Sequence, residues 1–316
     1  KYAAKRIAML LFTMVIVSLL AFVAFDVISG DPATAMLGTQ ATPERVAELR
    51  AELGLDRPLL VRYGEWLLGF FTGNLGTSYS YHQPVWELIA PKVGVTLCLS
   101  LLSFALIAVI SVPLGVRSAT RRSQGILSGA ETLFNQLCMA VPPFFTAILL
   151  TFCFSTVLRW FVHGSFPGLG SDFFGSLRYL LFAAVSIAIP RIAMTVRMLR
   201  STIRQEMGRA YVRTAISRGN DRRGVLYGHV LKNSLVPVVT FLAQTMAEIV
   251  AGSIVVEQAF AIPGLGRMLV ASIGSRDYPV VQAIVVILAL WVVLAGTAAD
   301  LINQRIDPRL RLGGGA

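Results

Sequence analysis

The chain has 316 residues, of which 55% are hydrophobic and only 14% are charged, and its mean hydropathy is +0.68. This composition excludes an ordinary soluble globular protein and predicts an integral membrane protein. The net charge of +11 is large enough for a nucleic-acid-binding protein. Its basic residues lie between apolar segments, however, so we attribute the charge to membrane topology and expect no nucleic-acid partner.

Four uncharged runs are long enough to cross a bilayer, because a spanning helix needs roughly 18 or more apolar residues. They have 19, 24, 27 and 21 residues and comprise residues 7–25, 93–116, 132–158 and 279–299. Two further apolar runs contain charges: Arg191 lies within residues 177–198, and Glu248 and Glu257 lie within residues 236–260. The sequence therefore predicts an all-α membrane protein with six transmembrane helices.

The first run, residues 7–25, is long for the apolar part of a cleaved signal peptide, and no clear Ala-x-Ala site follows it before Asp26. We interpret it as a retained helix. The chain begins at Lys1 without an initiator Met, so we expect a short N-terminal piece to be missing.

Lysine and arginine are distributed unevenly around these runs. If the N-terminus is cytoplasmic, the inner segments carry 18 of them and the outer segments carry 8, so the positive-inside rule places both termini and the 199–236 loop in the cytoplasm. The predicted organisation is a first transmembrane helix in residues 1–30, a periplasmic helical segment in residues 31–92 and a core of five further transmembrane helices in residues 93–316.

The outer segment is too long for an unstructured connection. Thr42 before Pro43 predicts the N-cap and first residue of a helix, which Gly54 ends. Pro58 then begins a second helix with an aromatic face. Two interpretations of that face remain open: anchoring in the lipid head-group region and shaping of a substrate entrance.

Charges and prolines inside the apolar runs predict local departures from simple spanning helices. A charge within a membrane span is costly, so Arg191 either extends toward the cytoplasm or pairs with Glu248. Pro113 and the pair Pro142–Pro143 predict kinks. Three cysteines lie in apolar runs without the spacing of metal ligands, so no metal site is expected: Cys98, Cys138 and Cys153.

The longest strongly charged segment is residues 200–237. Nine of the 28 lysines and arginines lie within residues 197–232. The pattern predicts a helix over residues 201–217, a C-terminal cap at Gly219 and a second turn or helix opened by Asn220 and Asp221. Two basic helices with a glycine break form a docking surface.

The order of residues in this segment is more specific than its charge. It runs Tyr211-Val212-Arg213-Thr214-Ala215, then Gly219, then His229, Leu231, Asn233, Leu235 and Pro237. It resembles the EAA loop of the permease subunits of ATP-binding-cassette importers, and most closely the branch that carries dipeptides, oligopeptides, glutathione and nickel chelates. Arg213 stands where the general family has an acid, and the closing proline is delayed to Pro237, two departures that the peptide branch shares. Residues 53–76 and 255–283 are similar to the same branch.

The resemblance implies a type I importer permease in the bacterial inner membrane. Its implied partners are a second permease, identical or paralogous, two cytoplasmic ATPases, an extracytoplasmic substrate-binding protein and the lipid bilayer. The implied ATPase-coupling residues are Ala210, Tyr211, Arg213, Thr214, Ala215, Arg218, Gly219, Arg222, Arg223 and His229. A short re-entrant outer loop is also implied, with Pro263, Gly264 and Gly266 in its turn and with Glu257 either as a cap for the turn or in contact with substrate.

Catalytic chemistry is not expected of this chain. No Gly-Lys pair occurs in the sequence, so a Walker-type phosphate loop is excluded. We expect no catalytic residue and no cofactor on this chain, and we expect ATP and Mg²⁺ to be bound by the partner ATPases.

Several functions remain open at this stage. Di- and oligopeptides are the expected cargo, and nickel, metallophore or opine-type small molecules are the alternative. A secondary transporter driven by an ion gradient would need ionisable groups at the membrane midplane, for which Arg191, Glu248 and Glu257 are the candidates. An intramembrane enzyme would need a constellation of nucleophile and base that the sequence does not contain.

Overall fold

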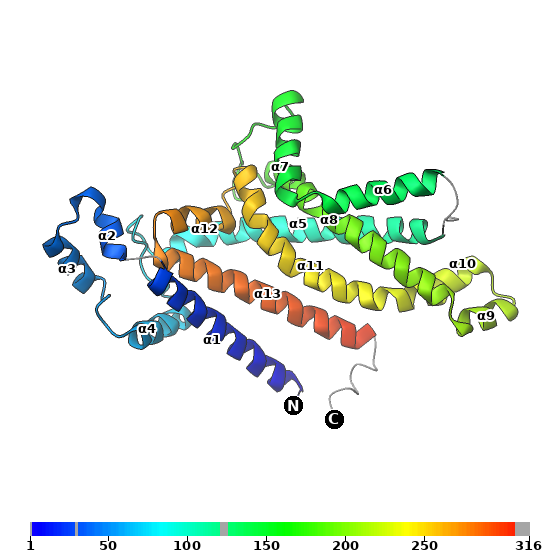
Figure 1. Cartoon of the computed structure of the whole chain (residues 1–316), viewed down its shortest axis with the longest axis horizontal. Coiled ribbons are helices and arrows are strands. Elements are labelled where there is room, and N and C mark those ends of the chain that lie inside the picture. The colour runs from blue at the N-terminus through cyan, green and yellow to red at the C-terminus, as the bar shows by residue number, and fades with distance from the viewer. Residues whose placement is uncertain (1, 29–30, 121–125, 307–316) are drawn as a thin grey trace. The chain divides into compact units, whose positions relative to one another are not determined.

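The computed structural model describes residues 2–28, 31–120 and 126–306 (Figure 1). This described part is helical and contains no strand, although Thr77 and Pro84 form one isolated antiparallel bridge. The chain divides into two compact units. The first comprises Lys1–Leu97 and Ile262–Val293, and the second comprises Cys98–Ala261 and Leu294–Ala316.

The first unit carries the outer segment. Its elements are α1 (Tyr2–Ile28), α2 (Pro32–Leu37), η1 (Gly38–Gln40), α3 (Pro43–Glu52), α4 (Leu59–Thr72), the start of α5 (Val85–Thr120), α12 (Leu265–Gly274) and most of α13 (Tyr278–Ile306). The predicted cap at Thr42 is confirmed, because its hydroxyl accepts a hydrogen bond from the Arg45 N–H at 3.4 Å. Pro58 directly precedes α4, also as predicted.

Helix α4 packs against α1 through a polar contact between apolar faces. The Tyr63 hydroxyl lies 2.9 Å from Ser18 Oγ and donates to the Val15 carbonyl at 3.2 Å. The Phe22 ring meets the Tyr63 ring edge-on, with 5.6 Å between centroids. The aromatic face of α4 is therefore used in part to hold α1.

A buried carboxylate joins the loop before α5 to the start of α13. The Asp277 side chain accepts hydrogen bonds from Ser78 Oγ at 2.5 Å, from the Tyr79 N–H at 3.0 Å and from the Ser80 N–H at 3.2 Å. Asp277 is completely buried, so these hydrogen bonds satisfy carboxylate oxygens that are shielded from water.

The second unit contains the remaining helices. They are the rest of α5, α6 (Ile126–Ala140), α7 (Pro143–Thr151), η2 (Phe152–Val157), α8 (Phe173–Met207), α9 (Ala210–Ser217), α10 (Arg222–Val225), η3 (Leu226–Val230) and α11 (Leu231–Ala259). The bend predicted at Pro142–Pro143 is confirmed: the chain turns by 96° between Gly129–Ala140 and Pro143–Val157. Pro113 does not interrupt α5, which continues to Thr120.

Helix α8 is the centre of the second unit and packs against α6, α7 and α11 (Figure 1). A Cβ added to Gly115 would lie 2.7 Å from Leu199 Cδ2, so the glycine lets α5 approach α8 closely. Asn135 Nδ2 donates to the Ala193 carbonyl at 3.0 Å and fixes α6 on α8.

Four helices of the described chain are long and apolar enough to cross a membrane, and a fifth span results if the bent pair at Pro142–Pro143 is counted as one. Within α1, the residues with described side chains form an apolar helix, Ala8–Ala24, that is shorter than the length required of a span. The number of six spans therefore remains a prediction.

Candidate functional site

The charged segment folds as two helices joined by a tight corner. The single helix predicted over residues 201–217 is wrong: α8 runs to Met207, and α9 begins at Ala210. Arg209 between them has an extended backbone, with φ −68° and ψ 151°. The helical periodicity continues across this corner, and hence the break is not visible in the pattern of apolar residues.

The glycine break occurs as predicted. Gly219 has φ +89°, a left-handed conformation that side chains with a Cβ rarely adopt. Its N–H donates to the Ile216 carbonyl at 2.9 Å, and the Asn220 N–H donates to the Ala215 carbonyl at 3.3 Å. Asp221 then caps α10 by accepting from the Gly224 N–H at 3.1 Å. Both predicted boundaries of the turn are confirmed.

Tyr211 connects three helices. Its hydroxyl donates to Glu206 Oε2 at 3.0 Å at the end of α8, and it accepts from Asn233 Nδ2 at 3.3 Å in α11. Burial raises the pKa of Tyr211; the Asn233 amide opposes this rise and the Glu206 carboxylate adds to it. The hydroxyl therefore stays protonated near neutral pH and can donate to Glu206.

The outward surface of this corner is basic and partly apolar. Its exposed residues, called the docking face below, are Ala210, Arg213, Thr214, Ile216, Ser217, Arg218, Arg222, Arg223, Tyr227 and His229. Ile216 and Tyr227 are 43% and 60% exposed, and sequence reasoning missed both. Asp221 is the only acid between residues 207 and 247, so the docking face is complementary to an acidic partner surface.

Other predicted coupling residues face inward or form the turn. Ala215 is half-buried, and Gly219 is exposed at the corner. Val212, which the sequence did not single out, is buried and anchors α9. Val212 faces inward, whereas the neighbouring Arg213 of the same helix is exposed.

Arg191 and Glu248 form an ion pair between α8 and α11. This confirms the predicted partner of Arg191. The Arg191 side chain is 21% exposed and the Glu248 side chain is 49% exposed. The pair thus joins the two longest helices of the second unit and leaves part of Glu248 accessible.

The outer-loop residues fall in both units. Glu257 is completely buried near the end of α11, in the second unit. Pro263 and Gly264 precede α12 in the first unit, and Gly266 is buried within it. The Leu265 N–H donates to Thr96 Oγ1 at 2.8 Å. The predicted end of the helix before Pro263 is confirmed, and the roles of these residues stay predictions.

The second unit also contains a cavity of about 860 Å³ between α5, α6 and α8. Its lining combines apolar side chains, among them Leu114, Phe134 and Ile192, with polar and charged ones. The polar and charged residues include Glu131, Thr132, Asn135, Arg117, Arg197, Arg200 and Arg204. The arginines of this lining can donate charge-assisted hydrogen bonds to an anionic group, and Arg200 already donates one to Thr132 Oγ1 at 3.3 Å. No group of three or more metal-ligating side chains occurs among the described residues.

Comparison with known protein families gives two matches. Residues 111–312 match the family described as binding-protein-dependent transport system inner membrane component. Residues 1–100 match the N-terminal part of such membrane components. Together the two matches cover almost the whole chain.

Individual relatives are similar over their full length. A putative peptide transport system permease protein of Brucella abortus is 38% identical over 307 residues, which are 97% of this chain and 98% of the relative. The oligopeptide transport system permease protein AppB of Bacillus subtilis is 34% identical over 312 residues, 98% of each chain. A probable peptide transporter permease of Sinorhizobium fredii is 31% identical over 310 residues, covering 98% of this chain and 99% of the relative.

These matches confirm the resemblance found in residues 200–237, and the helical architecture is that of a type I importer permease. The chain belongs to the family of inner-membrane components of binding-protein-dependent transport systems.

Proposed function

We propose that the chain is one of two permease subunits of an ATP-driven importer that carries di- and oligopeptides across the bacterial inner membrane. The observation that carries the proposal is similarity over nearly the whole length to proteins named as peptide permeases. The expected partners are a second permease, two cytoplasmic ATPases and an extracytoplasmic binding protein. Both termini and the docking face lie in the cytoplasm in this proposal, in agreement with the distribution of lysine and arginine.

The docking face supplies the contact with an ATPase. A short helix that presents a few apolar side chains can lie in a groove of its partner. Ile216 and Tyr227 are suited to such contact, and the exposed arginines provide charge-assisted hydrogen bonds around them. In this proposal ATP and Mg²⁺ are bound by the ATPase, and the permease holds no cofactor and no catalytic residue.

Movement of α9 reaches the membrane helices through Tyr211. The Tyr211 hydroxyl forms hydrogen bonds with both Glu206 and Asn233. A displacement of the docking face therefore moves the end of α8 and the start of α11 together. The Arg191–Glu248 pair joins the same two helices further along. Rigid-body movement of packed helices can alternate access to a transport path. The arginine-lined cavity offers donors for a peptide carboxylate.

Reconstitution tests this function. The permease is placed in proteoliposomes with its copurifying ATPases and binding protein, and uptake of a labelled dipeptide, a labelled oligopeptide and a nickel chelate is compared. The proposal expects peptide uptake that requires ATP and the binding protein. Uptake of the nickel chelate alone would assign the other cargo, and uptake that persists without the ATPases but stops with an uncoupler would identify a secondary transporter.

A further inference from the structure

The cavity of about 860 Å³ in the second unit has a basic part. Arg197, Arg200 and Arg204 are three or four residues apart on α8 and therefore lie on one face of that helix. Arg117, near the end of α5, lines the same cavity. Glu131 is the only acid among the described residues of the lining. The lining thus has an excess of positive charge, and a cleft with charges of one sign attracts ions of the other.

Three of these arginines have donors available for a ligand. Arg117, Arg197 and Arg204 are exposed, and their guanidinium groups form no hydrogen bond or ion pair with any residue that the structure describes. Arg200 differs, because it donates to Thr132 Oγ1. A guanidinium group presents paired N–H donors that match the oxygens of a phosphate or a carboxylate. The cavity can therefore hold an anionic oxygen group without breaking a contact of these three side chains.

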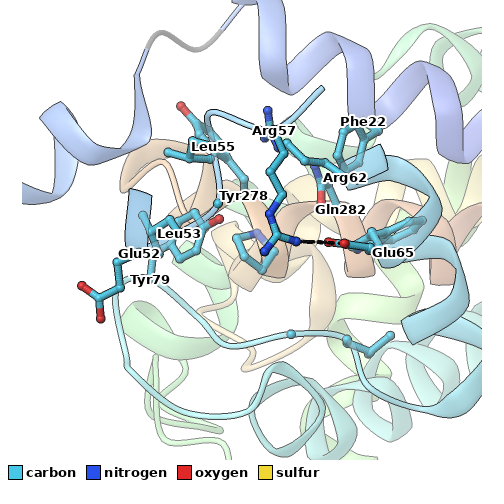
Figure 2. A pocket seen from close by; sticks show the side chains of 15 residues that line it. Phe22, Glu52, Leu53, Leu55, Arg57, Arg62, Glu65, Tyr79, Tyr278 and Gln282 are labelled. Carbon is cyan, nitrogen blue, oxygen red and sulfur yellow. Dashed lines mark hydrogen bonds and ion pairs between the residues drawn. The ribbon is translucent and has the colours of Figure 1, made fainter. Parts of the chain in front are cut away.

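The cavity of the first unit, of about 420 Å³, has a different charge pattern. Arg57 pairs there with both carboxylate oxygens of Glu65, at 2.8 and 3.0 Å, as the dashed lines in Figure 2 show. The Arg62 guanidinium lies 5.6 Å from the centroid of the Phe22 ring. Neighbouring side chains thus engage the arginines of that cavity, in contrast to the three arginines in the second unit.

The basic part of the lining lies where two apolar runs end. Arg117 directly follows the uncharged run 93–116, and Arg197 lies one residue before the end of the run 177–198. The ends of two independent spans place these arginines at the depth of lipid head groups. In the proposed orientation this is the cytoplasmic leaflet, where basic pockets between membrane helices are suited to anionic head groups.

The other part of the lining is apolar and extends into the membrane. Ile189 and Ile192 line the cavity from α8, and Ile189 lies about 12 Å from Arg197 along the helix axis at a rise of about 1.5 Å per residue. Leu114 of α5 and Phe134 of α6 also line the cavity and are 42% and 68% exposed. This wall is suited to an acyl chain, because it presents apolar surface at the depth of the hydrocarbon.

We propose that this cavity binds an anionic phospholipid, with the phosphodiester held by Arg117, Arg197 and Arg204 and one acyl chain against Leu114 and Phe134. The bound phosphate offsets the repulsion between the arginines of α5 and α8 and so holds the ends of these helices together. A peptide carboxylate and a soluble anion would use the same donors. The position at the ends of two apolar runs and the apolar wall favour the lipid.

Lipid titration of the purified, delipidated full-length chain, followed by native mass spectrometry, tests the proposal. The probe is dioleoyl phosphatidylglycerol, and dioleoyl phosphatidylcholine, whose head group has no net charge, is the comparison. Wild type should bind one molecule of phosphatidylglycerol at least about tenfold more tightly than phosphatidylcholine. Arg197→Gln and Arg204→Gln should each weaken this site by about fivefold, and the double variant should lose the preference. Arg197→Lys keeps the charge and should retain most of it.

Arg178→Gln is the matched control, because Arg178 is exposed at the other end of α8 and does not line the cavity. Equal affinity of wild type and the double variant for phosphatidylglycerol would overturn the proposal. Displacement of the lipid by millimolar dipeptide or inorganic phosphate would also overturn it and would assign the cavity to cargo or to a soluble anion. Resistance to both competitors would support the lipid.

The titration includes no transport step, so its outcome does not depend on which cargo the importer carries. Thermal unfolding in detergent checks that the variants are folded. The substituted side chains are exposed, so their replacement should change stability little. If the double variant does not fold, the two single variants and Arg197→Lys still distinguish a charged site from an uncharged one.

Discussion

The hydroxyl of Tyr211 accepts a hydrogen bond from the side-chain amide of Asn233 at 3.3 Å, although the two residues are 22 positions apart in the sequence. The same hydroxyl donates to Glu206. One phenol therefore joins the end of α8, the short helix α9 and the start of α11. This arrangement makes α9 a rigid extension of two long helices and not a separate loop.

Tyr211→Phe should weaken coupling without preventing assembly. The change keeps the ring but removes two hydrogen bonds, each contributing about 1 kcal/mol to stability. We expect the ATPases to copurify with the variant, while transport per ATP hydrolysed falls. Tyr81→Phe is the control, since Tyr81 is exposed in the loop before α5. Transport per ATP equal to that of wild type would show that these bonds do not transmit movement.

Alanine at Gly219 and at Gly228 should have opposite effects. Neither glycine has a heavy atom within 4 Å of an added Cβ, so steric overlap does not distinguish them. Gly219 has φ +89° and Gly228 lies in the helical segment η3. Gly219→Ala should lower the free energy of unfolding by about 1–2 kcal/mol, and Gly228→Ala should raise it by up to about 1 kcal/mol. Thermal unfolding in detergent measures the stability of both variants. Equal effects of the two substitutions would contradict the left-handed cap at Gly219.

Exchanging the charges of Arg191 and Glu248 should show whether transport needs the ion pair itself or each side chain at its own position. Arg191→Glu and Glu248→Arg each place two like charges together in a membrane-embedded helix pair and should reduce transport at least tenfold, because an unpaired charge there is costly. The double variant restores opposite charges and should recover a large part of the activity. Uptake as low in the double variant as in the single variants would show that each side chain has a separate role.

Loss of the Asp277 carboxylate should destabilise the first unit strongly. Asp277→Ala leaves the buried hydroxyl of Ser78 and the part-buried N–H groups of Tyr79 and Ser80 without their acceptor. We expect a loss of roughly 2–4 kcal/mol in the free energy of unfolding. Asp56→Asn breaks only an exposed pair with Arg50 and should cost less than about 1 kcal/mol. Equal shifts in unfolding temperature would contradict the role of Asp277.

Features set by neighbouring residues were predictable from the sequence. Thr42 and Gly219 act through backbone groups within a few residues of them, so local residue type was sufficient. The bend at Pro142–Pro143 also has a local cause, because proline removes a backbone hydrogen-bond donor. The family was likewise evident from the order of residues in the docking segment.

Contacts between distant residues were harder to predict. The Arg191–Glu248 pair was one of two alternatives that the sequence left open, since a charge within a membrane span needs either a partner or access to water. The contacts of Asn233 and Asp277 were less predictable from the sequence. Their partners lie 22 and about 200 positions away, and helical periodicity contains no information about such pairs. An acid directly before Tyr278–Pro279 was the one local sign that Asp277 had a structural role. The corner at Arg209 was missed because the apolar pattern of α8 continues into α9.

Site-directed cross-linking tests the central claim most directly. In a background in which Cys98, Cys138 and Cys153 are replaced by Ser, single cysteines are introduced as Ile216→Cys on the docking face and as Ser165→Cys in an exposed loop before α8. A short thiol-reactive cross-linker is then applied to the complex with its ATPases. We predict that the cysteine at position 216 links to the ATPase and that the cysteine at position 165 does not. Cross-linking at position 165 without cross-linking at position 216 would place the ATPase elsewhere and contradict the account.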